Sequence, residues 1–213
     1  MLKLVYFDFN FWRVDILRLS LSYSNIPYEY ERIPRKNWVK KKKDFPFGQL
    51  PVIIFDGKTY AHTHTLAKFC AKKSSLYENV ESKILIIDQV IDWANEVTNL
   101  IAPSIRAAIR EKDFEKSKKL RQEFIEKDLN IWFSYLEKLL ENCSVTKKFF
   151  TDRFTIADIT AWRMIYWFTC GKLELIDASF LNDLPILKNY FNYINNFEPL
   201  TRLNVFKDVT TSN

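Results

Sequence analysis

Two kinds of hydrophobic spacing follow one another along this chain. In roughly the first third, short apolar runs rich in β-branched and aromatic residues alternate with segments of helical spacing. From about residue 82 onwards the spacing is helical, with no convincing strand. The pattern therefore predicts an α/β domain followed by an all-helical domain.

The individual elements follow from the same spacing. The expected strands cover residues 3–8, 28–32, 52–55 and 58–61. The expected helices of the first domain cover about 14–24, 36–42 and 63–73. Those of the second domain cover about 82–110, 114–141, 155–169, 184–196 and 199–205. We accordingly expect domains at 1–76 and 82–213, joined by a linker at 77–81.

The most informative segment is PFGQLPVIIFDG, residues 46–57. The apolar run that starts at Pro51 predicts a short strand, and Asp56-Gly57 predicts the two-residue turn of a hairpin. Pro51 has no N–H for a strand ladder, and an X-Pro bond is the one place where a cis peptide has a low cost. Such a bond lets Leu50 turn its N–H and C=O outward, where a bound peptide can pair with them.

A helix start follows this hairpin directly. Leu66, Phe69 and Cys70 have helical spacing after His62-Thr63, so we expect Thr63 to be the cap of a helix. Helix N-termini carry unpaired N–H groups and the positive end of the helix dipole, and both favour a bound carboxylate. The residues leave a second interpretation open, in which Thr63 only caps its own helix.

The helix expected at 155–169 also begins with a clear signal. Thr155 and Asp158 have the T-x-x-D spacing of a capping box, in which each side chain accepts a hydrogen bond from the backbone of the other residue. We interpret this box as a folding element without a catalytic role.

Composition and charge narrow the classes of function. A chain of 213 residues that is 47% apolar is long enough for two small hydrophobic cores. The net charge of +6 includes a lysine run at 40–43, which would fit a nucleic-acid or membrane footprint. Short lysine runs are more often solvated faces, and this run lacks the interleaved aromatic residues of a single-strand binder. We therefore expect neither nucleic acid nor a membrane as a partner.

The same sequence predicts a cytoplasmic protein. The N-terminus enters LKLVYFDF without the features of a signal peptide, and no apolar stretch reaches membrane-spanning length. Cys70, Cys143 and Cys170 are an odd number without C-x-x-C or histidine-rich spacing. We expect them to be reduced and structural, and we expect no metal site.

Five motifs together resemble the cytosolic glutathione transferases, with closest likeness to the sigma class. They are KLVYFD at 3–8, RVD at 13–15 with Arg18 following, RIPRKNWVKKKKDFPFGQLPV at 32–52, DGKTYAHT at 56–63 and FTIADITAW at 154–162. The resemblance covers nearly the whole chain and depends on the order and spacing of the motifs together. It implies a thioredoxin-like fold for the first domain, glutathione as cosubstrate, a small apolar electrophile as second substrate, and a homodimer.

The resemblance also implies the chemistry. Tyr6, near the end of the first expected strand, matches the tyrosine whose hydroxyl donates a hydrogen bond to the glutathione thiolate. Arg13 would support the electrostatics of that thiolate or orient Tyr6. The ordinary alternatives are a strand aromatic for Tyr6 and a surface charge at a helix start for Arg13.

The glutathione-binding residues carry over from the same motifs. Trp38 and Lys42 are four residues apart, so on a helical turn they project from one side and suit the glycine carboxylate. Leu50 would pair with the cysteinyl part of glutathione through its backbone, and Thr63 would hold the γ-glutamyl carboxylate. The full expected set is Trp38, Lys42, Gln49, Leu50, Pro51, His62, Thr63 and Glu96.

Two of these assignments need particular arguments. His62-Thr63 replaces the common Gln-Ser pair, which keeps a hydroxyl and hydrogen bonding but changes the shape of the first side chain. Asn95-Glu96 stands where the family usually has an acidic pair. Glu96 is expected to reach the γ-glutamyl amine across a dimer, so that two-fold symmetry gives two sites.

The electrophile pocket is where the sequence departs most from the family. The stretch DFNFW between Tyr6 and Arg13 replaces a shorter segment that contains glycine, so Phe11 and Trp12 are expected to wall the pocket or to close it. The resemblance also implies Thr98 and Met164 as pocket residues.

Three functions remain open from the sequence. The first is a transferase that conjugates glutathione to an apolar electrophile, with a role in detoxification. A glutathione-dependent isomerase of prostaglandin synthase type would use the same thiolate. A noncatalytic, transferase-like binding or structural protein is the third, favoured by the His62 exchange and the crowded loop.

Overall fold

The computed structural model describes residues 1–211 and divides into two compact units. The first unit contains residues 1–84 together with the segment that begins at Asn196, and the second contains residues 85–195. The domain boundaries predicted from the sequence, 1–76 and 82–213 with a linker at 77–81, stay a prediction. The fold class is confirmed, since a small mixed sheet precedes a mostly helical region.

The first unit is built on a four-stranded sheet with the order β2-β1-β3-β4. Its strands are β1 (Leu2–Phe7), β2 (Tyr28–Ile33), β3 (Val52–Phe55) and β4 (Lys58–Ala61). β1 and β2 are parallel, whereas β3 is antiparallel to both β1 and β4. Val5 lies opposite Val52, so the residues that precede β3 lie beside those at the end of β1.

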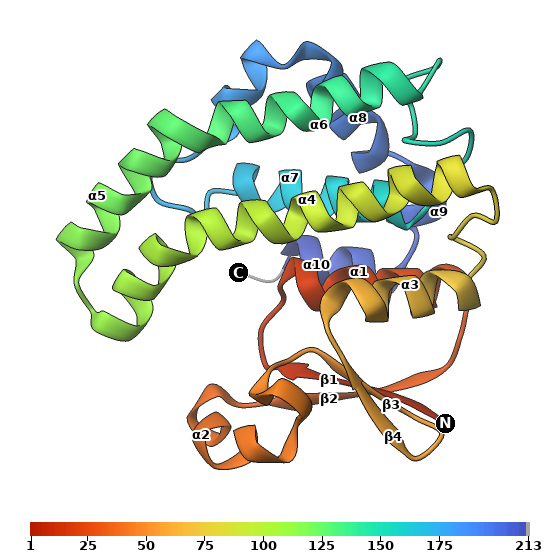
Figure 1. The fold of residues 1–213 in the computed structure, drawn as a ribbon, viewed down its shortest axis with the longest axis vertical. Coiled ribbons are helices and arrows are strands. Elements are labelled where there is room, and N and C mark those ends of the chain that lie inside the picture. The colour runs from red at the N-terminus through yellow and green to blue at the C-terminus, as the bar shows by residue number, and fades with distance from the viewer. Residues whose placement is uncertain (212–213) are drawn as a thin grey trace. The chain divides into compact units, whose positions relative to one another are not determined.

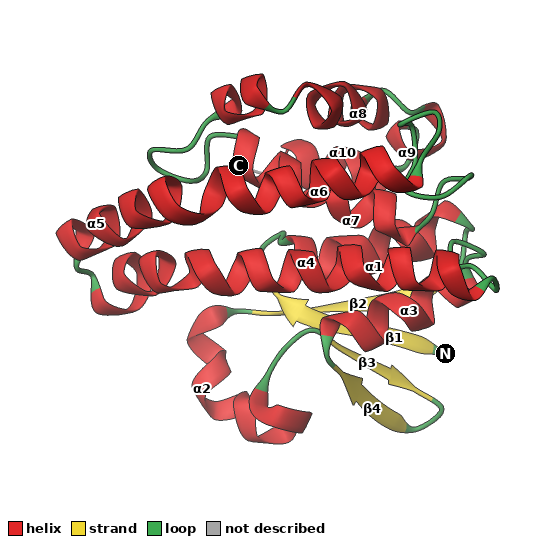
Figure 2. Cartoon of the chain, turned by 45° about the horizontal axis from the view of Figure 1, so that its top comes forward, coloured by secondary structure: helices red, strands yellow, loops and turns green. Residues whose placement is uncertain are grey.

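Both faces of this sheet are covered. Figures 1 and 2 show α1 (Trp12–Tyr23) and α3 (Thr63–Lys73) side by side on one face. On the other face Val5, Ile33 and Val52 form a buried cluster, against which the side chains of Phe45 and Leu50 pack. Burial on both faces explains why β1 and β3 are apolar along most of their length.

The hairpin between β3 and β4 has the predicted turn. Asp56 and Gly57 both have positive φ, 51° and 71°, which is the backbone of a type I′ turn. The Leu50-Pro51 peptide bond is cis, as the sequence allowed.

The second unit is helical. Its elements are α4 (Glu81–Arg106), which starts in the first unit, α5 (Phe114–Phe124), α6 (Asn130–Cys143), α7 (Ile156–Thr169) and α8 (Pro185–Asn195). Single π-helical turns at 107–111 and 125–129 follow α4 and α5. The helices predicted at 82–110 and 114–141 are therefore present, but the second is interrupted by a π-helical turn. A 3₁₀ segment at Ala178–Asp183 was not predicted.

The chain returns to the first unit with two short helices, α9 (Glu198–Thr201) and α10 (Asn204–Thr211). The single helix predicted at 199–205 is therefore wrong. The Leu203 N–H bonds to the Leu200 carbonyl at 3.1 Å, a 3₁₀-type closure that ends α9, and the Lys207 N–H then bonds to Leu203 at 3.3 Å to begin α10. Within residues 1–211, none of the helices has the length and apolar character needed to cross a bilayer.

The predicted capping box of α7 is confirmed, and it is fully buried. One Asp158 oxygen accepts from the Thr155 N–H at 2.8 Å and from the Thr155 hydroxyl at 3.1 Å. The other oxygen accepts from the Phe150 N–H at 3.0 Å and from the Tyr190 hydroxyl at 3.1 Å. This carboxylate therefore joins the start of α7 to a preceding loop and to α8.

We predict that Asp158→Asn lowers the free energy of unfolding by about 1–3 kcal/mol, because an amide keeps one acceptor oxygen and leaves buried donors at the other position unsatisfied. Urea unfolding of the purified protein measures the change. Asp177→Asn is the matched control, since Asp177 also accepts a backbone bond, from Ser179 at 2.7 Å, at an exposed position. Equal effects of the two substitutions would contradict the prediction.

Candidate active site

Tyr6 lies near the end of β1, with its side chain almost fully buried at 3% exposure. Its ring makes edge contacts with Phe7 and Phe9, at centroid distances of 5.3 and 5.6 Å. Burial raises the pKa of Tyr6, and the positive charge of Arg13 opposes this rise to a smaller degree. The hydroxyl therefore stays protonated at neutral pH and is available as a hydrogen-bond donor.

Arg13 connects Tyr6 to the start of α3. It lies in the first turn of α1, and its Nη1 donates to the Thr63 hydroxyl at 3.4 Å. Its guanidinium also lies over the Trp12 ring, 4.9 Å from the centroid. Burial lowers the pKa of Arg13, which the interaction with Tyr6 partly offsets. The fold thus brings Tyr6, Arg13 and Thr63 together.

The prediction that Thr63 is the helix cap is wrong by one residue. The Leu66 N–H bonds to the His62 carbonyl at 3.0 Å, so His62 is the N-cap and Thr63 is the first residue of α3. His62 has φ of 70° and ψ of 121°, a conformation that residues with a Cβ rarely adopt. Its exposed imidazole lies 4.4 Å from the ring of Phe47.

Trp38 and Lys42 occupy one side of a short helical segment, as predicted. The segment consists of a 3₁₀ turn at Arg35–Asn37, α2 (Trp38–Lys41) and a second 3₁₀ turn at Lys42–Asp44. The Lys42 N–H bonds to the Trp38 carbonyl, which places the two residues one turn apart. The Trp38 ring contacts Phe7 edge-on at 5.0 Å and stacks on Phe45 at 5.9 Å. These contacts hold the segment beside the end of β1.

Lys42 passes over Gly48. A Cβ added to Gly48 would lie 2.8 Å from Lys42 Cε, and Gly48 has a φ of 55°. The absence of a side chain at Gly48 therefore lets the Lys42 stem lie close to the loop that leads to Gln49 and Leu50. Gln49 is exposed and Leu50 is half-buried, so the loop presents one side chain to solvent and one to the sheet.

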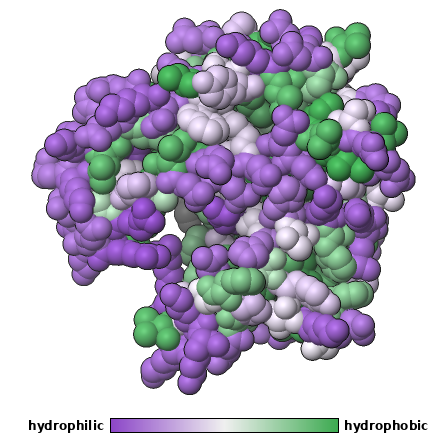
Figure 3. All heavy atoms as spheres, viewed as in Figure 1, coloured by the Kyte–Doolittle hydropathy of each residue, from purple (hydrophilic) through white to green (hydrophobic). Residues whose placement is uncertain are grey.

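The surroundings of this loop are strongly basic. Lys40, Lys41 and Lys43 are all exposed next to Lys42, and Lys41 forms an ion pair with Glu31 at 3.3 Å. Figure 3 shows hydrophilic side chains gathered over the α2 segment. A positive surface of this kind raises the local concentration of anionic ligands.

The predicted site residues of the second unit have different surroundings. Glu96 is exposed on α4, whereas the Asn95 amide donates to its own helix, to the Ile91 carbonyl at 3.1 Å. The Thr98 hydroxyl donates to the Ala94 carbonyl at 2.7 Å. A groove of about 480 Å³ runs beside Glu96. It is lined by Gln89, Asp92, Trp93, Glu96, Trp132, Tyr135, Leu136 and Leu139.

The four residues expected around the electrophile differ in exposure. Phe11 is half-buried at the start of α1, where its carbonyl accepts from Val14 and Asp15 at 3.0 Å each. Trp12 and Met164 are fully buried, and Thr98 is 7% exposed. Their roles in an electrophile pocket stay predictions.

Sequence reasoning missed two residues of the loop after β1. The Phe9 ring lies against Tyr6 and stacks on Phe7 at 5.6 Å, and Asn10 makes polar contacts with distant parts of the chain. The unusual stretch DFNFW was the available signal, but the prediction drawn from it named only Phe11 and Trp12.

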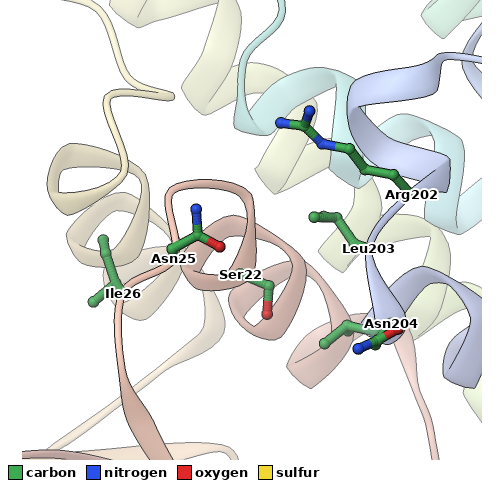
Figure 4. A pocket seen from close by; sticks show the side chains of 7 residues that line it. Ser22, Asn25, Ile26, Arg202, Leu203 and Asn204 are labelled. Carbon is green, nitrogen blue, oxygen red and sulfur yellow. The ribbon is translucent and has the colours of Figure 1, made fainter.

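A hollow elsewhere in the first unit contains none of the predicted site residues. It has a volume of about 520 Å³ and is lined by residues at the end of α1 and around the start of α10 (Figure 4). These are Ser22, Asn25, Ile26, Arg202, Leu203, Asn204 and Val205. Among residues 1–211 there is also no cluster of His, Cys, Asp and Glu that could hold a metal ion.

Comparison with known proteins gives a consistent set of matches. Residues 99–202 match the family model described as "Glutathione S-transferase, C-terminal domain". The human "Hematopoietic prostaglandin D synthase" is 25% identical over 82% of this chain and 79% of its own length. "Glutathione S-transferase 3" of Caenorhabditis elegans is also 25% identical, over 67% of this chain and 68% of its own.

Solved structures share the fold. "Structure of prostaglandin synthase D of Nilaparvata lugens" superposes with a TM-score of 0.77 and 24% identity, over 94% of this chain and 95% of that one. A glutathione S-transferase of Necator americanus, Na-GST-3, gives a TM-score of 0.75 and 24% identity over 94% of both chains. The arrangement of a mixed sheet followed by a helical region is therefore shared with these two solved structures.

We predict that Gly48→Ala weakens the binding of S-hexyl glutathione, because the new Cβ displaces Lys42. Gly57→Ala is the matched control, since Gly57 also has a positive φ, 71°, but a Cβ added there would have nothing within 4 Å. Both substitutions should lower the free energy of unfolding by a similar amount, about 1–2 kcal/mol, from the left-handed backbone alone.

Calorimetry separates the two effects. Only Gly48→Ala should raise the dissociation constant, by about tenfold if a charge-assisted hydrogen bond of Lys42 is lost. Equal affinities of the two variants would remove Lys42 from the binding site.

Proposed function

Since this chain belongs to the glutathione S-transferase family, we propose that it conjugates glutathione to a small apolar electrophile through a thiolate stabilised by Tyr6. The observation that carries the proposal is the bond from Arg13 to Thr63 beside the buried Tyr6. This contact links the expected position of the sulfur to the N-terminus of α3, where the γ-glutamyl carboxylate is expected.

Tyr6 would act as a neutral donor. Its buried hydroxyl stays protonated, so it can donate a hydrogen bond to the charged sulfur of glutathione. The bond that it would donate to the neutral thiol is weaker. A donor that favours the charged form lowers the pKa of the thiol and raises the thiolate fraction near neutral pH. Arg13 adds a positive charge that favours the same anion. The thiolate then attacks the electrophile directly, without a metal or a covalent enzyme intermediate.

The tripeptide would lie along the loop between α2 and α3. Lys42 and Trp38 suit the glycine carboxylate, with Gln49 beside them, because Gly48 leaves room for the Lys42 stem to lie close to the loop. The backbone of Leu50, before Pro51, would pair with the cysteinyl part. Thr63 would donate to the γ-glutamyl carboxylate at the positive end of α3. His62, beside Phe47, would flank this end of the ligand.

The second substrate would meet an aromatic surface. Phe9 and Phe11 follow Tyr6 in sequence and are both half-buried, and Phe9 also contacts Tyr6 directly. Trp12 is fully buried and would support this surface from behind rather than contact the electrophile. An apolar electrophile fits such surroundings. Met164 is as fully buried as Trp12 and would likewise act only as support, and Thr98 is the other residue proposed for the pocket.

A glutathione-dependent isomerase is the second candidate, because relatives of this chain are named prostaglandin D synthases. It would use the same thiolate and return the glutathione unchanged. Assays with an aryl halide and with a cyclic endoperoxide separate the two activities. Glutathione binding without turnover of either compound would favour the noncatalytic binding protein.

A sigma-like homodimer in the cytoplasm, with a role in detoxification, is part of the same proposal. The groove beside Glu96 contains Trp93, Trp132 and Leu139, and an apolar groove of this kind is suited to cover by another copy. Glu96 would then lie at the edge of the dimer interface and reach the γ-glutamyl amine of its partner's ligand.

We predict that Tyr6→Phe lowers turnover by about 10–1000-fold, because one donor to the reacting anion is lost. The affinity for S-hexyl glutathione should change little. Loss of the donor raises the pKa of the bound thiol, so the decrease in kcat/KM should be larger at acidic than at alkaline pH. Tyr60→Phe, on β4 and 43% exposed, is the control and should match the wild type. Unchanged turnover of Tyr6→Phe would require a different thiolate donor.

We predict that Glu96→Ala weakens glutathione binding while the free energy of unfolding stays within about 0.5 kcal/mol of the wild type, as is usual for an exposed position. Calorimetry and sedimentation measure affinity and oligomeric state together. Glu126→Ala, also exposed in the second unit, is the control. A pure monomer that binds glutathione as tightly as the dimer would refute the action of Glu96 across an interface.

A further inference from the structure

Helix α10, the last one within residues 1–211, is joined to the loop that follows Tyr6. α10 lies beside α1 (Figure 1), and the two helices carry the partners of an ion pair. Arg18 Nη2 of α1 lies 2.6 Å from Asp208 Oδ2 of α10, although the residues are 190 positions apart. The Arg18 side chain is 8% exposed and that of Asp208 is 37% exposed, so the guanidinium is buried while the carboxylate is partly open to solvent.

Asn10 is held by both partners of this pair. Its Oδ1 accepts from Arg18 Nη1 at 3.1 Å, and its Nδ2 donates to the backbone carbonyl of Asp208 at 3.1 Å. The amide of Asn10 therefore uses its acceptor on the Arg18 guanidinium and a donor on the backbone of Asp208, the two residues that form the ion pair. Arg18 also lies 3.5 Å from the buried Asp15 and over the ring of Tyr30, 4.7 Å from the centroid. Arg18 is thus fixed from several sides and provides a rigid anchor for Asn10.

Asn10 stands between the aromatic residues of the site. Phe9, the residue before it, contacts Tyr6 at 5.6 Å and has Arg35 over its ring at 4.8 Å. Phe11, the residue after it, supplies the carbonyl that begins α1. A fixed Asn10 therefore limits the positions of both neighbouring rings relative to the Tyr6 hydroxyl.

We infer that Asp208 is a positioning residue for the electrophile, which acts through Arg18 and Asn10 on the aromatic surface beside Tyr6. The inference rests on the proposed function. It assigns to α10 a part in the choice of second substrate and none in the binding of glutathione. Apart from Glu96 of another copy, the contacts that would hold glutathione come from the α2 segment, its following loop and α3. The neighbours that fix Lys42 and Thr63 lie in those segments and at Arg13 of α1.

The test compares Asp208→Asn with the wild type in three measurements. Hydrogen exchange over residues 8–12 should accelerate by about tenfold or more, because the loop loses a charged anchor. The KM for aryl halide and epoxide substrates of increasing size should change by about 3–10-fold, with a different order of preference. The dissociation constant of glutathione should stay within about twofold of the wild type.

Three further variants define the result. Asn10→Ala should reproduce the effect of Asp208→Asn, and Asp208→Glu should restore part of the wild-type preference because it keeps the negative charge. Asp56→Asn is the matched control for loss of a carboxylate, at a turn position where asparagine also tolerates the positive φ of 51°. If Asp208→Asn does not fold, Asn10→Ala and Asp208→Glu still decide the question.

The outcomes separate this inference from the proposed function. Accelerated exchange with an unchanged preference among electrophiles would overturn it, as would a parallel loss of glutathione affinity, which indicates general loosening of the first unit. Unchanged exchange and unchanged preference would also overturn it. A wild-type protein that does not bind glutathione would refute the proposed function first, and this inference with it, before any variant is compared.

Discussion

The pairing of β1 with strands on both of its sides is the constraint on which the candidate site depends. Its hydrogen bonds to β2 and β3 fix the end of the strand, where Tyr6 emerges. Because Val5 faces Val52 in an antiparallel pair, the turn into Pro51 is carried to the same edge of the sheet. A shift of one residue in this register would turn Val5 out of the buried cluster and move Tyr6 to the opposite face. The pairing of β1 with β3 therefore determines both which side chains enter the buried cluster and on which face Tyr6 lies.

Electrostatics at this edge combines a neutral donor with a buried cation. Removing Tyr6 from water disfavours its ionised form, so the side chain remains a phenol beside Arg13. Arg13 is itself partly desolvated, which leaves its charge weakly screened, and it donates to the hydroxyl of Thr63. An anion that enters beside Tyr6 and Arg13 therefore meets a hydrogen-bond donor and a positive charge that the fold already holds in place.

The sequence predicted features that are local, and it missed those that depend on distant contacts. The four strands, the Asp56-Gly57 turn and the Thr155–Asp158 box each follow from a few adjacent residues, and all are present. The helix cap was placed one residue late, because a threonine is the better capping side chain but the His62 carbonyl takes the first bond of the ladder.

Longer-range features had no comparable signal. The approach of Lys42 to Gly48 depends on how three short helical turns fold back on one another. The spacing of hydrophobic residues does not predict such packing. The contact of Arg18 with Asp208 joins residues 190 positions apart, so it could not be read from spacing. The proposed roles of the site residues came from the family resemblance. The structure adds which of their side chains contact one another.

The position of Asp208 after the helical unit has a consequence for synthesis. Proteins are made from the N-terminus, and the sheet that carries Tyr6 is complete once β4 has left the ribosome. The anchor for Asn10 is made long afterwards, since α10 follows the whole helical unit in the chain. A nascent chain thus exposes the loop after β1 in an unanchored form throughout the synthesis of the helical unit, and that loop reaches its final arrangement only once α10 has been made.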